Sequence, residues 1–178
     1  VISLDADQAH ALLAQVLANF DRRHRNLLRL FALRGDEMLA SYAPDVELTP
    51  IHKQLLGSFF LNEYSFEAAA LFNPSIVPHP DQTGLVGGAM RVVMSMRAVG
   101  EGHISSVAFR EGIINDQNQL RLAPEPPFAT ATDVHGWGDD QMPNGPVTVH
   151  RHRDSTLSGT VIFPITQAQS KGLEDMRI

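Results

Sequence analysis

The N-terminal part of the chain has the hydrophobic pattern of helix. Between Asp5 and Tyr42, apolar residues recur every three or four positions, which is the period of an amphipathic helix. We expect one long helix or two consecutive helices here, with Gly35 as a stop signal. The next apolar stretch, from 54 to 72, fits a helix or a strand by its pattern alone, and Pro74 forces a break after it.

After Pro80 the pattern changes to the two-residue period of strands. Residues 90–99 alternate in this way, which is typical of a half-buried strand. One side of that strand would carry Arg91, Val93, Ser95 and Arg97, and the other Val92, Met94, Met96 and Ala98. With the apolar stretches 103–114 and 119–122, it predicts an antiparallel meander. Further strands are expected at 147–152 and 159–165.

Two stretches lack a usable period. Residues 71–84, LFNPSIVPHPDQTG, hold three prolines and a glycine, so we expect a rigid polar loop there. Residues 124–146 are also rich in Pro and Gly, and we expect a loop of unusual length for a compact domain.

Composition and charge remove several classes of function. The 178 residues carry 14 Lys and Arg against 20 Asp and Glu, a net charge of -6, so we expect no nucleic-acid partner. The chain has no cysteine, which excludes disulfides, thiolate metal ligands and a Cys nucleophile. No apolar stretch approaches the roughly 18 residues of a membrane span, and the N-terminus lacks a signal-peptide pattern. We therefore expect a cytoplasmic protein with no membrane partner.

The C-terminal string KGLEDMRI combines adjacent carboxylates with a guanidinium. On an extended segment Asp175 and Arg177 would project to the same side, while Glu174 would face away. A carboxyl beside a guanidinium can place a proton donor next to an anion-binding group. Taken alone, the same string also fits a surface salt bridge.

Three blocks of the sequence, together with their order and spacing, resemble one known family. The blocks EYSFEAAALFNPSIVPHPDQTG, MRVVMSMRAVGEGHISSVAFREG and VIFPITQAQSKGLEDMR resemble glycoside hydrolase family 130, the β-mannoside phosphorylases and β-mannosidases. The resemblance is to the branch that has a helical N-terminal extension and acts on β-1,2-linked mannosides. It covers residues from about 54 to 123 and 159 to 178.

The resemblance implies a five-bladed β-propeller with the active site at its axial face. We therefore expect a mixed fold, in which a helical N-terminal extension spans residues 1–53. Residues 54–178 would form a partial propeller of mainly antiparallel strands, its first blade or two.

The resemblance also implies roles for individual residues. Asp175 would be the catalytic acid, with Gly172 allowing the turn before it. The substrate would be bound by Asn73, Ser75, Arg97, His103 and Arg177. The resemblance leaves open whether Arg97 lies near the sugar or near phosphate. Ser105 also matches the family, whereas Glu67 and Asp81 are expected to be structural, one closing a hydrogen bond in the fold and the other capping a turn.

The function implied is phosphorolysis of β-1,2-linked mannosides with inversion, which gives mannose 1-phosphate. Such a reaction needs one carboxyl as proton donor, because inorganic phosphate, the co-substrate, is already an anionic nucleophile. No further cofactor is expected. In the family, the residues that bind phosphate lie largely beyond the acid motif. A five-bladed propeller also needs about twenty strands, at about four per blade, whereas the pattern here shows about five. We therefore expect the N-terminal part of a longer enzyme, which forms homo-oligomers or associates with the remainder.

Three alternatives remain open. The enzyme could be a β-mannoside hydrolase of the same family, with water as the nucleophile. The chain could instead be an inactive fragment that acts as a sugar-binding or interaction module. The third alternative is a metal site. The spacing of His150 and His152 places both on one strand face, and they could bind zinc or manganese together with His135 and Asp139.

Overall fold

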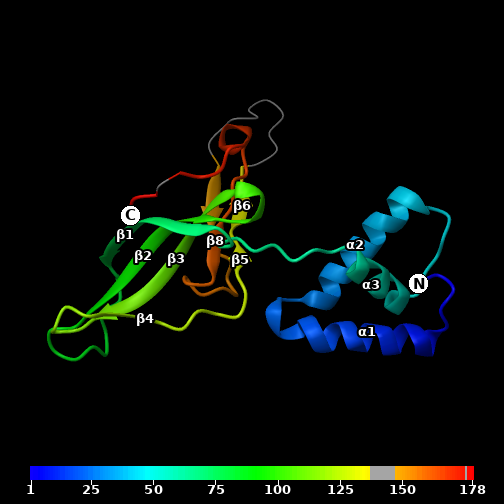
Figure 1. Ribbon diagram of the computed structural model, residues 1–178, viewed down its shortest axis with the longest axis horizontal. Coiled ribbons are helices and arrows are strands. Elements are labelled where there is room, and N and C mark those ends of the chain that lie inside the picture. The colour runs from blue at the N-terminus through cyan, green and yellow to red at the C-terminus, as the bar shows by residue number, and fades with distance from the viewer. Residues whose placement is uncertain (137–146, 175) are drawn as a thin grey trace. The chain divides into compact units, whose positions relative to one another are not determined.

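The computed structural model describes residues 1–136, 147–174 and 176–178 and divides into two compact units (Figure 1). The first unit is Val1–Glu63 and the second is Tyr64–Ile178. The predicted mixed architecture of helices followed by mainly antiparallel strands is confirmed. The boundary between the units lies after Glu63 rather than after residue 53, because the stretch from 50 to 59 is a helix of the first unit.

The first unit is a set of three α-helices. They are α1 (Ala6–Phe20), α2 (Leu27–Tyr42) and α3 (Pro50–Phe59), with the short 3₁₀ turn η1 (Asp21–Arg23) after α1. The region from Asp5 to Tyr42 therefore holds two helices rather than one, and the left-handed backbone of Asn26 (φ 53°) marks the start of the second. The buried core between the helices consists of Ala9, Leu13, Leu27, Phe31 and Leu55.

Local side-chain bonds set where two of these helices begin. Asp5 caps α1, because its carboxylate accepts from the backbone N–H of Gln8 at 2.8 Å and Gln8 returns a bond to the Asp5 N–H. Thr49 caps α3 and also contacts the ring of the buried His52 through Nδ1 at 2.7 Å. The other ring nitrogen of His52 bonds the Leu4 carbonyl at 3.0 Å, which ties the N-terminal residues to α3.

Two glycines let α2 and α3 cross in backbone contact. A Cβ on Gly35 would lie 2.2 Å from the carbonyl oxygen of Lys53, and one on Gly57 would lie 1.8 Å from that of Phe31. The prediction that Gly35 ends a helix is therefore wrong. Gly35 is buried inside α2, and its missing side chain serves the helix crossing rather than a helix terminus.

The second unit is built on a twisted sheet. Its strands are β1 (Ala70–Pro78), β2 (Met90–Val99), β3 (Ser105–Ile114), β4 (Leu120–Leu122), β5 (Thr130–Ala131) and β8 (Thr160–Ile162), in the order β1-β2-β3-β8-β5 with β4 paired to β3. All pairs are antiparallel except β5 with β8. The predicted meander over 90–122 is thus confirmed. A separate antiparallel pair joins β6 (Asp133–His135) and β7 (Thr148–His150), and short 3₁₀ turns are η2 (Glu101–His103) and η3 (Gln167–Gln169).

The loop predictions were wrong in part. Residues 70–78 form β1 instead of a rigid loop, and the prolines fit because β1 is an edge strand whose pairing with β2 is interrupted between Phe72 and Ser75. Within the predicted loop 124–146, β5 and the short β6 are strands, and residues 137–146 lie outside the described part of the chain.

β2 has buried residues on both of its sides, whereas its alternation predicted a half-buried strand, and Met90 at its start is exposed. On the side of Arg91 and Arg97, Val93 packs with Val107 and Phe109 of β3. Leu157 and Leu173, from later parts of the chain, cover this cluster. The side of β2 that carries Arg91 and Arg97 therefore faces a buried hydrophobic cluster, because segments distant in sequence lie over it.

Glu67 and Asp81 have the structural roles predicted for them. Glu67 pairs at 2.6 Å with Arg110, whose side chain is only 4% exposed and also meets Glu125 at 2.7 Å. Asp81 caps a turn by accepting from the N–H and the hydroxyl of Thr83 at 2.9 and 2.7 Å. These bonds to the charged form hold the pKa of the Asp81 carboxyl below its usual value.

Replacing Gly57 by alanine tests the close crossing of α2 and α3. We expect Gly57→Ala to lower the free energy of unfolding of the helical unit by at least about 2 kcal/mol, because the new methyl group overlaps backbone that cannot rotate away. Urea denaturation followed by circular dichroism measures this. Ser41→Ala, at an exposed position of α2, is the control and should change the value by less than about 0.5 kcal/mol. Equal midpoints for the two variants would contradict the crossing.

Candidate functional site

The C-terminal segment, residues 172–178, crosses the sheet over three neighbouring strands, and its described residues are 172–174 and 176–178. The backbone N–H of Leu173 donates to the Ser105 carbonyl of β3 at 2.9 Å. The Ser95 hydroxyl of β2 donates to the Met176 carbonyl at 3.0 Å, and the Ile178 N–H reaches the Ser75 hydroxyl of β1 at 3.4 Å. The segment therefore follows the strands in the order β3, β2, β1, and Figure 1 shows it ending beside β1.

Gly172 lets the segment approach β3 closely. Its φ of 102° belongs to the left-handed region, and a Cβ there would lie 2.7 Å from the Cβ of Ser105. The Gly172 N–H donates to the Gln169 carbonyl at 2.8 Å, which closes the turn that follows η3. Glycine is therefore required both for the turn and for the contact with the strand.

Arg97 is held at two of its nitrogens. Its Nε donates to the Ser105 hydroxyl at 3.0 Å, and its Nη1 donates to Glu174 Oε2 at 2.8 Å. Its side chain is 26% exposed and that of Glu174 is 72% exposed, so the pair lies at the surface of the site with the guanidinium on the inner side. These two bonds fix the plane of the guanidinium relative to the sheet.

The bulge in β1 brings a second group of polar atoms to the segment. Asn73 has a left-handed backbone (φ 49°), and the register with β2 shifts between Phe72 and Ser75. The Pro74 carbonyl, exposed by this irregularity, accepts from Arg177 Nη1 at 3.4 Å. Side chains from β1 and β2 and the C-terminal segment thus surround one patch of polar groups.

Most of the residues predicted to bind substrate lie in this patch. Ser75 accepts from the Ile178 N–H, Arg97 bonds Glu174, and Arg177 donates to the Pro74 carbonyl, whose chain neighbour is Asn73. His103 is different. It lies in the turn before β3 with an exposed side chain, which bonds none of the other predicted site residues in the described structure. Asp175, the predicted acid, lies outside the described residues.

Two residues of the patch carry roles that the sequence did not predict. Glu174 was expected only to face away from Asp175 and Arg177, whereas it is the partner of Arg97. Ser95 is fully buried and anchors the segment. A signal for Ser95 was present, because it alternates with Arg97 on one side of the predicted strand and a polar residue there needs a partner if the face is covered.

The histidines considered for a metal site do not form one within the described residues. The rings of His135 and His150 meet edge to face with centroids 5.1 Å apart. His152 lies 4.0 Å from Asp133 and 3.9 Å from Asp154, and Asp139 lies outside the described residues. Over the described part of the chain, no three His, Cys, Asp or Glu side chains gather in a way that could hold a metal ion.

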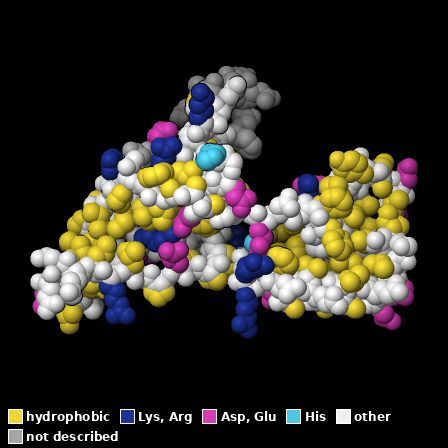
Figure 2. Space-filling model, viewed as in Figure 1, with side chains coloured by type: hydrophobic (Ala, Val, Ile, Leu, Met, Phe, Trp, Pro, Cys, Tyr) yellow, Lys and Arg dark blue, Asp and Glu magenta, His cyan; other side chains and the backbone are white. Residues whose placement is uncertain are grey.

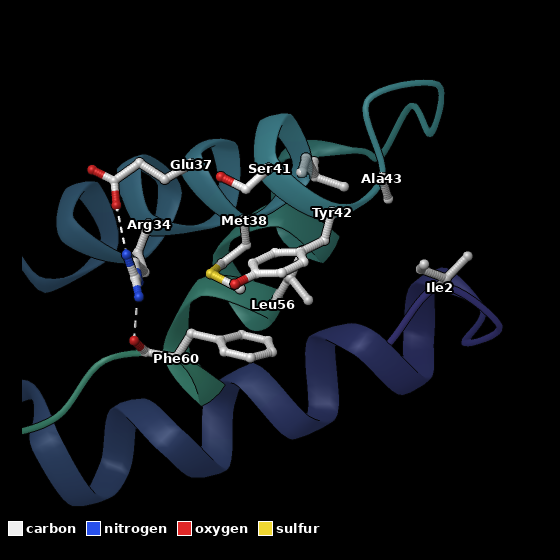
Figure 3. Close-up of a pocket in the computed structure, with 10 residues that line it drawn as sticks. Ile2, Arg34, Glu37, Met38, Ser41, Tyr42, Ala43, Leu56 and Phe60 are labelled. Atoms are coloured by element: carbon white, nitrogen blue, oxygen red, sulfur yellow. Dashed lines mark hydrogen bonds and ion pairs between the residues drawn. The ribbon is translucent and has the colours of Figure 1, made fainter.

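A hollow with a volume of about 750 Å³ lies in the helical unit. Figure 3 shows Met38 and Tyr42 of α2 facing Leu56 and Phe60 at α3. The two charged residues that line the hollow pair with each other, since Arg34 donates to Glu37 at 2.9 Å. Arg34 also donates to the Phe60 carbonyl at 3.0 Å. This apolar groove lacks the cluster of polar groups found on the sheet, so the patch around the C-terminal segment is the candidate site.

No protein-family model, no curated protein and no solved structure matches the chain. Among the described residues, no helix has the length and apolar character needed to cross a membrane. The function is therefore inferred from the residues of the patch.

Replacing Gly172 by alanine should detach the C-terminal segment from β3. We expect hydrogen exchange at the Leu173 amide to accelerate roughly tenfold or more, because left-handed backbone strain costs about 1–3 kcal/mol and the methyl group overlaps Ser105. Gly102→Ala is the matched control, since Gly102 also has positive φ (66°) but open space around it. Equal exchange at Leu173 in both variants would show that the contact with Ser105 does not hold the segment.

Proposed function

We propose that this chain is the N-terminal part of an enzyme of glycoside hydrolase family 130 that phosphorolyses β-1,2-linked mannosides with inversion. One observation carries the proposal. The sequence blocks that resemble this family, those holding Asn73, Ser75 and Arg97 and the GLEDMR string, are far apart in the chain and come together in one hydrogen-bonded patch. Convergence of separate motif blocks on one patch is what a shared substrate site requires.

The reaction places the catalytic demand on one carboxyl. Asp175 donates a proton toward the glycosidic oxygen, by way of a substrate hydroxyl, while a phosphate oxygen attacks the anomeric carbon from the opposite face. The C–O bond to the leaving sugar breaks as the C–O bond to phosphate forms, which yields mannose 1-phosphate and a shortened mannoside. Because phosphate is the nucleophile, a second carboxylate to activate water is unnecessary.

The polar patch supplies what such a substrate needs. A mannoside is a neutral polyol, and hydroxyls, amides and guanidinium groups recognise it by hydrogen bonds. Asn73, Ser75 and Arg97 bind the sugar in this proposal, Arg177 supports the acid motif, and a role for His103 in substrate binding rests on the resemblance alone. Inorganic phosphate is the co-substrate, and we place the enzyme in the cytoplasm, in accord with a chain that has no cysteine.

The sheet is proposed to be the first blade of a five-bladed propeller. Its central strands form an antiparallel meander, as propeller blades do. Figure 2 shows hydrophobic side chains gathered over the strands. The register places five large exposed apolar residues on one face of the sheet, which are Leu71, Ile76, Met90, Leu120 and Leu122. A blade buries such a face against a neighbouring blade or another chain.

The complete enzyme should release mannose 1-phosphate from a β-1,2-mannobiose in phosphate buffer. Product is measured by chromatography, with and without inorganic phosphate. Equal rates without phosphate would instead assign the protein to the β-mannoside hydrolases. Absence of cleavage under both conditions would leave a sugar-binding or interaction module and reject the enzyme.

Asp175→Asn in the complete enzyme should lower kcat by about 10²-fold or more, the scale of general acid catalysis, because the amide keeps the volume but cannot donate the proton. Asp45→Asn, at an exposed position in the helical unit, is the matched control. Near wild-type turnover for Asp175→Asn, together with a large loss of kcat in Glu174→Gln, would assign the acid to Glu174.

The 178-residue chain alone should be inactive and should self-associate through its apolar sheet face. Light scattering after gel filtration measures the mass, and Leu122→Glu should shift the population toward monomer because it buries a charge in the contact. Gln119→Glu, which adds the same charge beside β4, is the control. A monodisperse monomer with measurable phosphorolysis would overturn this expectation.

A further inference from the structure

We propose that Glu174 is a positioning residue that fixes Arg97 and balances its charge, so that Arg97 binds neutral sugar hydroxyls rather than phosphate. The identification of the sugar rests on the proposed function. The assignment of Glu174 itself rests on the contact between Arg97 Nη1 and Glu174 Oε2 at 2.8 Å. The resemblance left open whether Arg97 lies near the sugar or near phosphate, and this contact is the argument for the sugar.

The geometry around Arg97 restricts its orientation. The hydroxyl of Ser105, a fully buried residue, accepts from Nε at 3.0 Å, and Glu174 accepts from Nη1. A guanidinium is planar and rigid, so two bonds at different nitrogens set the directions of all its N–H groups. Its remaining donors are thereby aimed before any ligand arrives, which lowers the entropic cost of binding.

Glu174 is itself positioned by the backbone. The turn at Gly172 and the bond from the Leu173 N–H to the Ser105 carbonyl place the next residue, Glu174, beside Arg97. Ser105 therefore bonds Arg97 through its hydroxyl and Leu173, the residue before Glu174, through its carbonyl.

The charge balance favours a neutral ligand at Arg97. A carboxylate in direct contact cancels the guanidinium's charge, and it would repel a phosphate dianion approaching the same group. A sugar hydroxyl experiences no such repulsion and can accept from the aimed N–H groups. Because the Glu174 side chain is 72% exposed, the pair adds little to folding stability.

Phosphate titration of the 178-residue chain tests the charge balance without any activity assay. The NMR signal of the Arg97 Nε–H group, assigned by its loss in Arg97→Lys, is followed at constant ionic strength. We expect Glu174→Gln to bind inorganic phosphate at Arg97 at least about threefold more tightly than wild type, because the repelling carboxylate is removed. Glu47 is exposed in the helical unit, and Glu47→Gln changes the net charge by the same amount. Its affinity for phosphate at Arg97 should equal that of wild type. Equal phosphate binding by wild type and Glu174→Gln overturns the proposal.

Kinetics of the complete enzyme test the positioning role. Glu174→Gln should raise KM for the mannoside about tenfold with kcat within about threefold of wild type, since the lost interaction aids binding rather than the chemical step. Glu174→Asp keeps the charge, so its KM should lie between those of wild type and Glu174→Gln. A fall in kcat with KM unchanged would make Glu174 a catalytic group and overturn the proposal. If the wild-type enzyme cleaves no mannoside, the proposed function fails, and the phosphate titration still decides the role of Glu174.

Discussion

The attachment of the C-terminal segment to serines of the sheet is the contact on which the candidate site depends. Ser105, Ser95 and Ser75 lie on successive strands, and each bonds a different point of the segment. Ser95 and Ser105 are buried, so their polar groups require these partners. The sheet thus gains a covered second face, and the segment gains a fixed path that brings Glu174 to Arg97 and Arg177 to the β1 bulge.

The fold could be predicted from sequence where the information is local. The two-residue alternation after Pro80 correctly predicted the antiparallel meander. The helical periodicity between Asp5 and Tyr42 correctly predicted the region of α1 and α2. Gly35 and Pro74 were misread because each residue has more than one use. Gly35 provides space for Lys53 of a helix that follows later, and Pro74 lies in an edge strand at the point where its pairing with β2 is interrupted, so its missing N–H is tolerated there.

The site could be predicted only as a set of residue types. The resemblance pointed to six residues. Ser75, Arg97, Arg177 and the backbone beside Asn73 lie around one patch, whereas His103 bonds none of them and Asp175 lies outside the described residues. The role of Glu174 depends on a partner 77 residues away, which neither spacing nor periodicity encodes. The same limit explains Ser95, because a strand pattern shows which residues share a side but not which distant segment covers that side.

The prolines of β1 determine how the sheet can meet other molecules. β1 is an edge strand, and Pro74 and Pro78 each remove a backbone donor while the bulge at Asn73 interrupts the pleat. A strand from another chain would find an incomplete ladder along this edge. Continuous strand addition of the kind that builds fibrils is therefore disfavoured at β1, which leaves the apolar face of the sheet, rather than this edge, as a surface for contacts.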